Sequence, residues 1–274
     1  MLGVSSSGYY NWQEYRKDKP VINEKDFLIQ AEFDDYRGKY GSPRISKELK
    51  KKGYNISQAT VGRRMKAMGL RVKKKLKYKK TTDSNHAYTI APNLLNQNFW
   101  VRMPNQVWVS DITYIRTEDG WVYLVVILDL FSRKVISWQT SYSLEHKFLM
   151  VAFNLAILRR NPDPGVIFHS DRGVQYACDS FKETLNNNGF LQSMSARGNC
   201  YDNAVAEAFF KTLKYELIAD YHFYNKRDLD RALFERIDRF YNHKRIHSTL
   251  DYQIPHHFEA NYFNNLRDSI CLFS

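Results

Sequence analysis

The sequence predicts an α/β domain with a mixed five-stranded sheet and flanking helices, preceded by a small all-α domain. Three observations support this prediction. Apolar residues make up 43% of the 274 residues, enough for a sizeable core. Strand patterns and helical patterns alternate after residue 100. The first 80 residues are basic and contain a pair of helical patterns instead.

Positive charge is concentrated in the first part of the chain. The net charge is +12, but residues 1–85 contain 21 Lys and Arg against 9 Asp and Glu, whereas residues 86–274 contain 20 of each kind. Lys and Arg that neutralise phosphates release condensed counterions, which drives binding to a polyanion. We therefore expect a polyanion partner for the N-terminal segment. An anionic membrane surface is the alternative.

Membrane insertion and secretion are not indicated by the sequence. No apolar run reaches the roughly 18 to 20 residues that a membrane span needs, and the N-terminus lacks a charged-then-apolar secretory pattern. We therefore expect a soluble cytoplasmic protein with no membrane span.

A helix-turn-helix is expected at about residues 40–70, within an N-terminal domain of residues 1–80. The segment ISKELKKKGYNISQATVGRRMKAMGL indicates a helix, a short turn and a second helix. Ser57 is a suitable N-cap for the second helix, and Ile56 and Val61 suit a hydrophobic staple. Gly69 stands where a left-handed residue commonly ends a helix.

The second helix of this pair and the segment after it are candidate DNA contacts. Side chains suited to base edges and phosphates would project from the helix; they are Gln58, Thr60, Arg63 and Arg64. The run RVKKKLKYKK then has seven Lys or Arg in ten residues, including Lys73, Lys74 and Lys75, and would follow phosphates. The alternatives are an ordinary helical hairpin with a solvated basic face and a plain solvated linker. Residues 81–100 are predicted to be a linker.

Three consecutive strands are expected at the start of the second domain, residues 101–260. The segment VWVSDITYIR alternates, so that Asp111 shares a strand face with Val109 and Thr113. The Asp-Gly pair that follows predicts a tight hairpin. The run WVYLVVILD is apolar on both faces, as in a central buried strand, and a third strand is expected at 135–139.

A helix and a fourth strand, GVIFHSD, follow the three strands. The helix is expected to bury one stripe of residues at helical spacing, namely Leu144, Phe148, Val151, Leu155 and Leu158. Three strands, a crossover helix and a further strand are the beginning of a ribonuclease-H-like fold. In that fold carboxylates from different strands meet at one sheet edge, where Asp111 and Asp171 would lie.

A third carboxylate is predicted on a later helix. After a helix at 181–188 and a short strand at 190–194, the loop SARGNCYDN leads into AVAEAFFKTLKYEL. Helical spacing aligns four polar residues on one face: Asn203, Glu207, Lys211 and Lys214. Glu207 could supply oxygen to a metal, and either lysine could neutralise a phosphate. The alternative is an exposed salt-bridge pattern worth about a few tenths of a kcal/mol.

Four ordered motifs resemble the catalytic core of insertion-sequence transposases: WVSDITYI, FHSDRGVQY, NCYDNAVAEAFFKTLKYEL and YNHKRIHSTLDYQIP. The resemblance is to second-reading-frame proteins of the insertion sequence three family, which are related to retroviral integrases. The segments LGVSSSGYYNW and YGSPRISKEL also resemble that family, so the resemblance covers nearly the whole chain.

The resemblance implies that Asp111, Asp171 and Glu207 are the catalytic metal ligands of a DDE-type enzyme. It implies Mg2+, with two ions and possible substitution by Mn2+, for in-line displacement at phosphorus. Lys214, seven residues after Glu207, would contact DNA. Such an enzyme nicks the 3′ ends of its element and transfers them to double-stranded DNA.

Other residues in the matched motifs have less defined roles. His169 could transfer a proton or be bonded within the core, and Asn203 would support the site. Arg245 could bind DNA or close the C-terminal fold. Residues 261–274 are expected to be a C-terminal tail.

Family analogy implies a homo-oligomer on paired DNA ends, associated with the bacterial nucleoid. In the family, a separate upstream frame supplies a further helix-turn-helix protein, which is a possible partner, and we expect that module to be absent from this chain. An alternative function is therefore a DNA-binding regulator, or an inactive partner of a fused full-length transposase.

Overall fold

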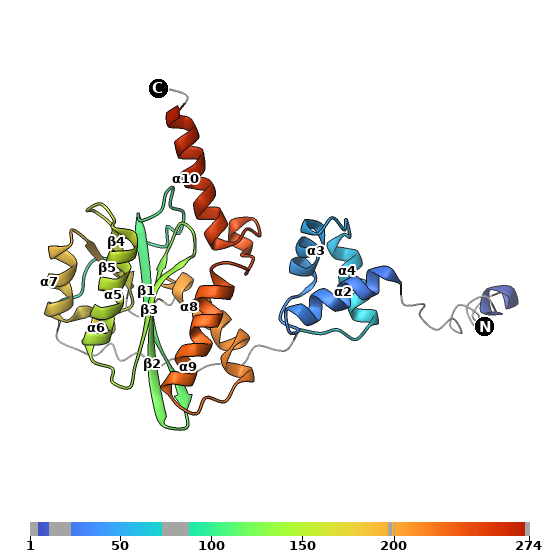
Figure 1. Ribbon diagram of the computed structural model, residues 1–274, viewed down its shortest axis with the longest axis horizontal. Helices are drawn as coiled ribbons and strands as arrows, with labels where there is room; N and C mark the ends of the chain where they lie inside the picture. Colours follow the sequence, from blue (N-terminus) through green and yellow to red (C-terminus); the bar gives the residue numbers. More distant parts are fainter. Residues whose placement is uncertain (1–4, 11–22, 73–87, 197–198, 200, 272–274) are drawn as a thin grey trace. The chain divides into compact units, whose positions relative to one another are not determined.

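The computed structural model describes residues 5–10, 23–72, 88–196, 199 and 201–271. The chain divides into two compact units, residues 1–74 and 75–274, and each is considered by itself (Figure 1). The helices found in these described ranges are all too short or too polar to cross a membrane.

Three helices pack against one another in the N-terminal unit: α2 (Glu24–Asp35), α3 (Ser42–Lys51) and α4 (Gln58–Ala67). The last two are the predicted helix-turn-helix. Ser57 caps α4 by accepting a hydrogen bond from the Thr60 backbone N–H at 3.2 Å. Ile56 and Val61 are both buried, and Gly69 has a left-handed φ of 72°. The local signals at both ends of α4 are therefore confirmed.

The second unit contains one mixed sheet with the strand order β3-β2-β1-β4-β5. β1, β2 and β3 pair antiparallel, whereas β4 pairs parallel with β1 and with β5. This arrangement confirms the predicted ribonuclease-H-like fold. The strands are β1 (Val107–Thr117), β2 (Gly120–Asp129), β3 (Val135–Ser141), β4 (Ile167–Ser170) and β5 (Leu191–Met194).

Helices cover both faces of the sheet (Figure 1). One face packs against α5 (His146–Arg160), α6 (Val174–Ala177) and α7 (Asp179–Asn187). The other packs against α8 (Ala204–Glu216), α9 (Lys226–Phe234) and the π-helix η2 (Glu235–Tyr241). The alternation of β1 creates both cores, because Val109 faces α8 while Trp108 faces α5. Two short 3-10 helices, η1 (Ile218–Asp220) and η3 (Ser248–Leu250), lie in the connections.

Helix α5 buries a different face from the predicted stripe. Phe148 is buried as expected, but Leu144, Val151 and Leu158 are exposed. Phe153 packs edge to face against Phe168 and Phe181, and this aromatic cluster selects the buried face. Both faces of the helix are apolar, so periodicity alone did not distinguish them. The buried residues of α5 are Phe148, Leu149, Ala152, Phe153 and Ala156.

The end of the predicted linker packs along β5. Leu95 is buried, and the Leu94 backbone N–H donates to the Ser193 hydroxyl at 2.9 Å. The Met194 backbone N–H donates to the Pro92 carbonyl at 3.3 Å. Residues 90–99 therefore belong to the packed second unit and are not a free linker.

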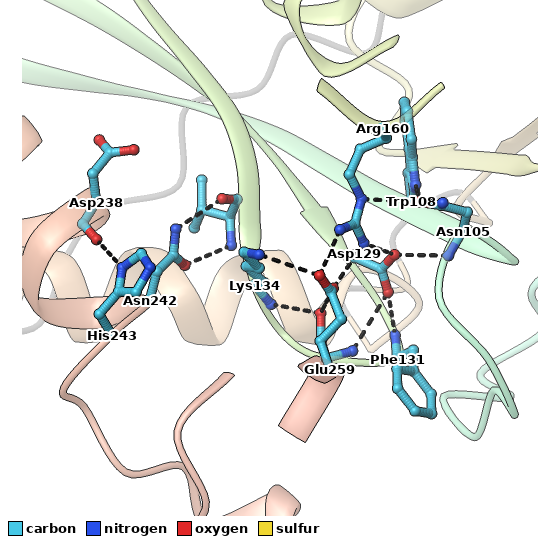
Figure 2. Close-up of polar contacts among 12 residues, drawn as sticks. Asn105, Trp108, Asp129, Phe131, Lys134, Arg160, Asp238, Asn242, His243 and Glu259 are labelled. Atoms are coloured by element: carbon cyan, nitrogen blue, oxygen red, sulfur yellow. Dashed lines mark hydrogen bonds and ion pairs between the residues drawn. The ribbon is translucent and has the colours of Figure 1, made fainter. Parts of the chain in front are cut away.

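The predicted C-terminal tail is largely helical, since α10 (Pro255–Cys271) runs through most of it. Figure 2 shows how α10 is attached to the sheet by Glu259. The Glu259 carboxylate accepts from Arg160 of α5 at 2.6 Å and from Ser132 at 2.9 Å. Arg160 also pairs with Asp129, at the end of β2, at 2.8 Å. This buried network fixes the first turns of α10.

Candidate active site

The sheet topology explains why Asp111 and Asp171 come together. β1 and β4 run parallel, and their pairing ends at Val109 and His169. Each aspartate follows this last pair by two residues, Asp111 within β1 and Asp171 directly after β4. Both carboxylates therefore lie at the place where the two strands part.

Backbone N–H groups orient both aspartates. Asp111 Oδ1 accepts from the Ile112 N–H at 2.8 Å, and Asp171 Oδ1 accepts from the Gly173 N–H at 3.0 Å. A Cβ atom at Gly173 would lie only 3.1 Å from the same Asp171 oxygen. Glycine at this position therefore leaves the carboxylate its space.

The electrostatics of Asp111 are those of a crowded anionic site. Burial raises the pKa of Asp111 well above its ordinary value, and the negative charges of Asp171 and Glu207 raise it further. The hydrogen bond from the Ile112 N–H and the charge of the Lys214 ammonium lower the pKa of Asp111, but by less than burial and the neighbouring negative charges raise it. A bound cation would relieve this repulsion.

Glu207 lies in the first turn of α8. Its carboxylate pairs with Lys211 at 3.4 Å, which is the i, i+4 salt bridge considered from the sequence. Lys214 lies closer to the aspartates: burial lowers its pKa, and the charge of Asp111 opposes that shift. Lys214 therefore interacts electrostatically with the aspartates, whereas Lys211 extends toward solvent.

The donor set suits a hard divalent cation, because Mg2+ prefers carboxylate oxygens. In the described ranges, however, no group of three or more His, Cys, Asp or Glu is arranged to hold a metal as it stands. Glu207, which pairs with Lys211 through one carboxylate oxygen, is not grouped with Asp111 and Asp171 in this arrangement.

Two buried polar residues, Asp202 and Asn203, connect the start of α8 to other parts of the second unit. Asn203 Nδ2 donates to the Ser110 carbonyl at 3.1 Å, which ties the start of α8 to the residue before Asp111. Asp202 accepts hydrogen bonds from the loop and from residues 93–97. Its donors are Asn93 Nδ2, Gln97 Nε2, Ala196 N and Asn199 Nδ2.

His169 is a core residue in this structure. Its Nδ1 lies 2.8 Å from the Ser193 hydroxyl and its Nε2 lies 3.3 Å from the Ser195 hydroxyl. Burial lowers the pKa of His169 to about 4, so the ring is neutral at pH 7. The geometry favours bonding within the core over proton transfer.

Tyr176 is a neighbour of the site that sequence reasoning missed. Its hydroxyl lies 2.8 Å from the Ser110 hydroxyl. Burial raises the pKa of Tyr176, and the charges of Asp111 and Asp171 raise it further, so the ring lies beside the aspartates. Its place in the motif FHSDRGVQY was the available signal.

The basic candidates fall into different environments. Arg63 is exposed on α4, but Arg64 pairs with Asp26 of α2 at 2.8 Å. Arg245 is buried and its Nε donates to Glu216 at 3.0 Å. This buried ion pair favours the alternative in which Arg245 closes the C-terminal fold over a contact with DNA. Lys73, Lys74 and Lys75 lie outside the described residues.

Comparisons with known proteins agree with this arrangement. Two integrase core domain families match residues 101–200 and 188–255, and an HTH-like domain family matches residues 22–78. A transposase for insertion sequence element IS904 of Lactococcus lactis is 41% identical, over 88% of this chain and 94% of that protein. Transposase InsF for insertion sequence IS3A of Escherichia coli is 36% identical, over 94% and 91%.

Among solved structures, the catalytic core domain of BIV integrase has a TM-score of 0.44 and 18% identity. The match covers 60% of this chain and 99% of that one.

Proposed function

This chain belongs to the insertion sequence three family of transposases, and we propose on that basis that it nicks the 3′ ends of its element and joins them to target DNA in a Mg2+-dependent reaction. It is a DDE-type polynucleotidyl transferase that acts in DNA transposition. The observation that carries the finer proposal is the pair of crowded aspartates, Asp111 and Asp171, at the point where β1 and β4 part.

Each residue of the site has a proposed role. Asp111 and Asp171 bind the metal, and Glu207 completes the set when its carboxylate leaves Lys211. Bound divalent metal, Mg2+ or Mn2+, would supply Lewis-acid activation of water or a 3′ hydroxyl and stabilise the leaving oxygen. Lys214 offsets the charge of the carboxylates and contacts a DNA phosphate. Asn203 holds α8 against β1.

The N-terminal unit is proposed to bind double-stranded DNA through α4. Gln58 is exposed at the start of this helix, Arg63 in its middle and Lys66 about one turn after Arg63. These are side chains that read base edges and phosphates. Arg64 instead fixes α4 to α2 through Asp26. Lys73, Lys74 and Lys75 are proposed phosphate contacts on sequence grounds alone.

We also infer that the chain works as a homo-oligomer on paired DNA ends. The support is the exposed face of α5, where Val151 and Leu158 lie in solvent beside Lys147 and Asn154. The upstream-frame helix-turn-helix protein stays a proposed further partner.

The test of the metal site is Glu207→Gln, which keeps the shape of the side chain and removes its charge. Cleavage and joining of labelled element-end DNA should fall by roughly 10³-fold, since a metal's charge stabilisation is worth several kcal/mol. DNA binding, measured by fluorescence anisotropy, should be unchanged. Glu183→Gln, at an exposed glutamate of α7, is the matched control and should keep full activity.

Each other outcome has a definite meaning. Joining retained by Glu207→Gln would reject the metal role. DNA binding without products from the unsubstituted chain would instead favour the regulator of a fused full-length transposase.

A further inference from the structure

The hairpin of β1 and β2 carries an exposed aromatic surface. The rings of Tyr114 and Trp121 pack edge to face with centroids 5.0 Å apart. They share one face of the sheet, because Arg116 pairs directly with Trp121 and Tyr114 precedes Arg116 by two residues. Trp121 nevertheless remains 48% exposed. A large ring left open in this way marks a candidate contact surface.

Two cations accompany these rings. The Arg116 guanidinium lies 5.4 Å from the centre of the Trp121 ring, and the Lys214 ammonium lies 5.5 Å from the centre of the Tyr114 ring. Lys214 also interacts electrostatically with Asp111. Lys214 therefore links this surface to the carboxylate site, and the charge of the surface suits a polyanion. Tyr114, Arg116 and Trp121 themselves lie on the sheet face opposite Asp111, because side chains alternate along β1.

The dimensions fit a short length of nucleic acid strand. Arg116, opposite Trp121, is five residues from Asp111 along β1, which is about 17 Å at the rise of an extended strand. That length corresponds to about five nucleotides at duplex spacing and to fewer in a stretched single strand. The odd spacing of Arg116 and Asp111 puts their two side chains on opposite faces, so a DNA strand that reached both would pass round the edge of β1 beyond its last pair with β4 at Val109.

The hairpin is fixed relative to the helix that carries Glu207. The Glu118 backbone N–H donates to the Phe223 carbonyl at 3.0 Å, and the Asp119 N–H donates to the Tyr224 carbonyl at 3.2 Å. Phe223 is buried in the same core as α8. The aromatic surface and the carboxylates are therefore held in one rigid frame.

We propose that Trp121 is a stacking platform for an unpaired base near the reacting end of the DNA, with Arg116 and Lys214 contacting the neighbouring phosphates. The proposal rests on the proposed function, because it places the reacting phosphate at Asp111 and Asp171. Stacking on an aromatic ring tolerates any base and is worth about tenfold in affinity or more.

The test measures binding without cutting. The full chain, without divalent metal, is titrated into an element end with a short single-stranded 3′ tail that carries 2-aminopurine, and into a fully paired end. Trp121→Ala should weaken binding of the tailed end by about tenfold and remove the quenching of 2-aminopurine fluorescence. Trp121→Phe, which keeps an aromatic face, should restore most of both signals.

Trp100→Ala is the matched control. Trp100 is 87% exposed. The carbonyl of the preceding residue, Phe99, accepts a hydrogen bond from Arg133, which follows the end of β2. Trp100 therefore lies near the end of β2, whereas Trp121 lies near its start. Trp100→Ala should leave both the affinity for the tailed end and the 2-aminopurine quenching unchanged. Thermal unfolding should show that each variant is folded.

Unchanged affinity and quenching in Trp121→Ala would overturn the proposal. So would a shift in oligomeric state with normal tail binding, which would assign Trp121 to a protein contact. Failure of the proposed function would appear separately, as an absence of cleavage products from the unsubstituted chain with Mg2+.

Discussion

At the scale of single residues, the position of Asp171 depends on a glycine. The Gly173 N–H holds the Asp171 carboxylate, and a Cβ at this position would meet that carboxylate at 3.1 Å and the Gln175 side-chain oxygen at 3.3 Å. The φ of Gly173 is −59°, which any residue can adopt. A side chain here would therefore act by crowding the carboxylate and not by straining the backbone.

Gly173→Ala should lower the rate of DNA cleavage by about tenfold, because small displacements of a reacting group are costly in rate. The unfolding temperature should change little. Gly41→Ala, whose Cβ would meet its nearest neighbour at an ordinary 3.7 Å, is the control. Rates would be measured on labelled end DNA with Mg2+. A fully active Gly173→Ala would show that Asp171 tolerates displacement.

Arginine residues show what sequence cannot resolve at this scale. Arg63, Arg64 and Arg245 all stand in basic or motif-rich segments, yet only Arg63 is exposed. Asp26 and Glu216, which pair with the other two, are distant in sequence. Composition could therefore nominate all three as DNA contacts but could not separate structural ion pairs from available cations.

At the scale of elements, α10 is held by one buried carboxylate. Glu259 accepts from Arg160 of α5 and pairs with Lys134, which precedes β3, at 3.2 Å (Figure 2). Removing one member of such a network leaves a buried charge unpaired, which is strongly destabilising. The network thus makes the C-terminal helix part of the catalytic unit.

The same network predicts a dependence of stability on pH. Burial raises the pKa of Glu259, but the hydrogen bond and charge of Arg160 and the charge of Lys134 lower it more, to about 2 from an ordinary 4.5. Because the pKa of Glu259 is lower in the folded protein, its carboxylate stabilises the fold fully above about pH 4.5, and this stabilisation is lost as the pH falls toward 2. Glu259→Gln should be less stable at pH 7.

Urea unfolding at steps between pH 7 and pH 3 would measure this effect. The unsubstituted chain should lose more stability below pH 4.5 than Glu259→Gln does, since only the former has this carboxylate to protonate. If the stability of the two proteins fell equally with decreasing pH, the Glu259 carboxylate would not have the stabilising role assigned to it.

Elements were predictable from sequence where their signals are local. The cap at Ser57 and the alternation of β1 mark α4 and the central strands within a few residues. The buried face of α5 and the attachment of α10 depend on contacts of Phe153 and Glu259 with residues far along the chain. The local sequence pattern therefore could not predict the buried face of α5 or the attachment of α10.

At the scale of the whole molecule, the sheet order brings the aspartates together, and the predicted strand sequence anticipated this. Glu207 was different, because helical spacing equally suited a salt bridge with Lys211, and that salt bridge is present. Helical spacing alone could not decide between these two roles, and the family resemblance favoured Glu207 as the third ligand. Whether Glu207 exchanges Lys211 for a metal is what the Glu207→Gln experiment decides.

The exposed face of α5 predicts how copies of the chain assemble. Leu158 is 80% exposed and Val151 lies on the same side of the helix, so burying this face against a second copy would remove apolar surface from water. Leu158→Glu should convert an oligomer to a monomer in size-exclusion chromatography with light scattering, with little effect on unfolding. Leu191→Glu, at an exposed leucine of β5, should leave assembly intact. If Leu158→Glu remained oligomeric, assembly would have to use another surface. If Leu158→Glu were monomeric and also joined paired ends less, the oligomer would be the active form.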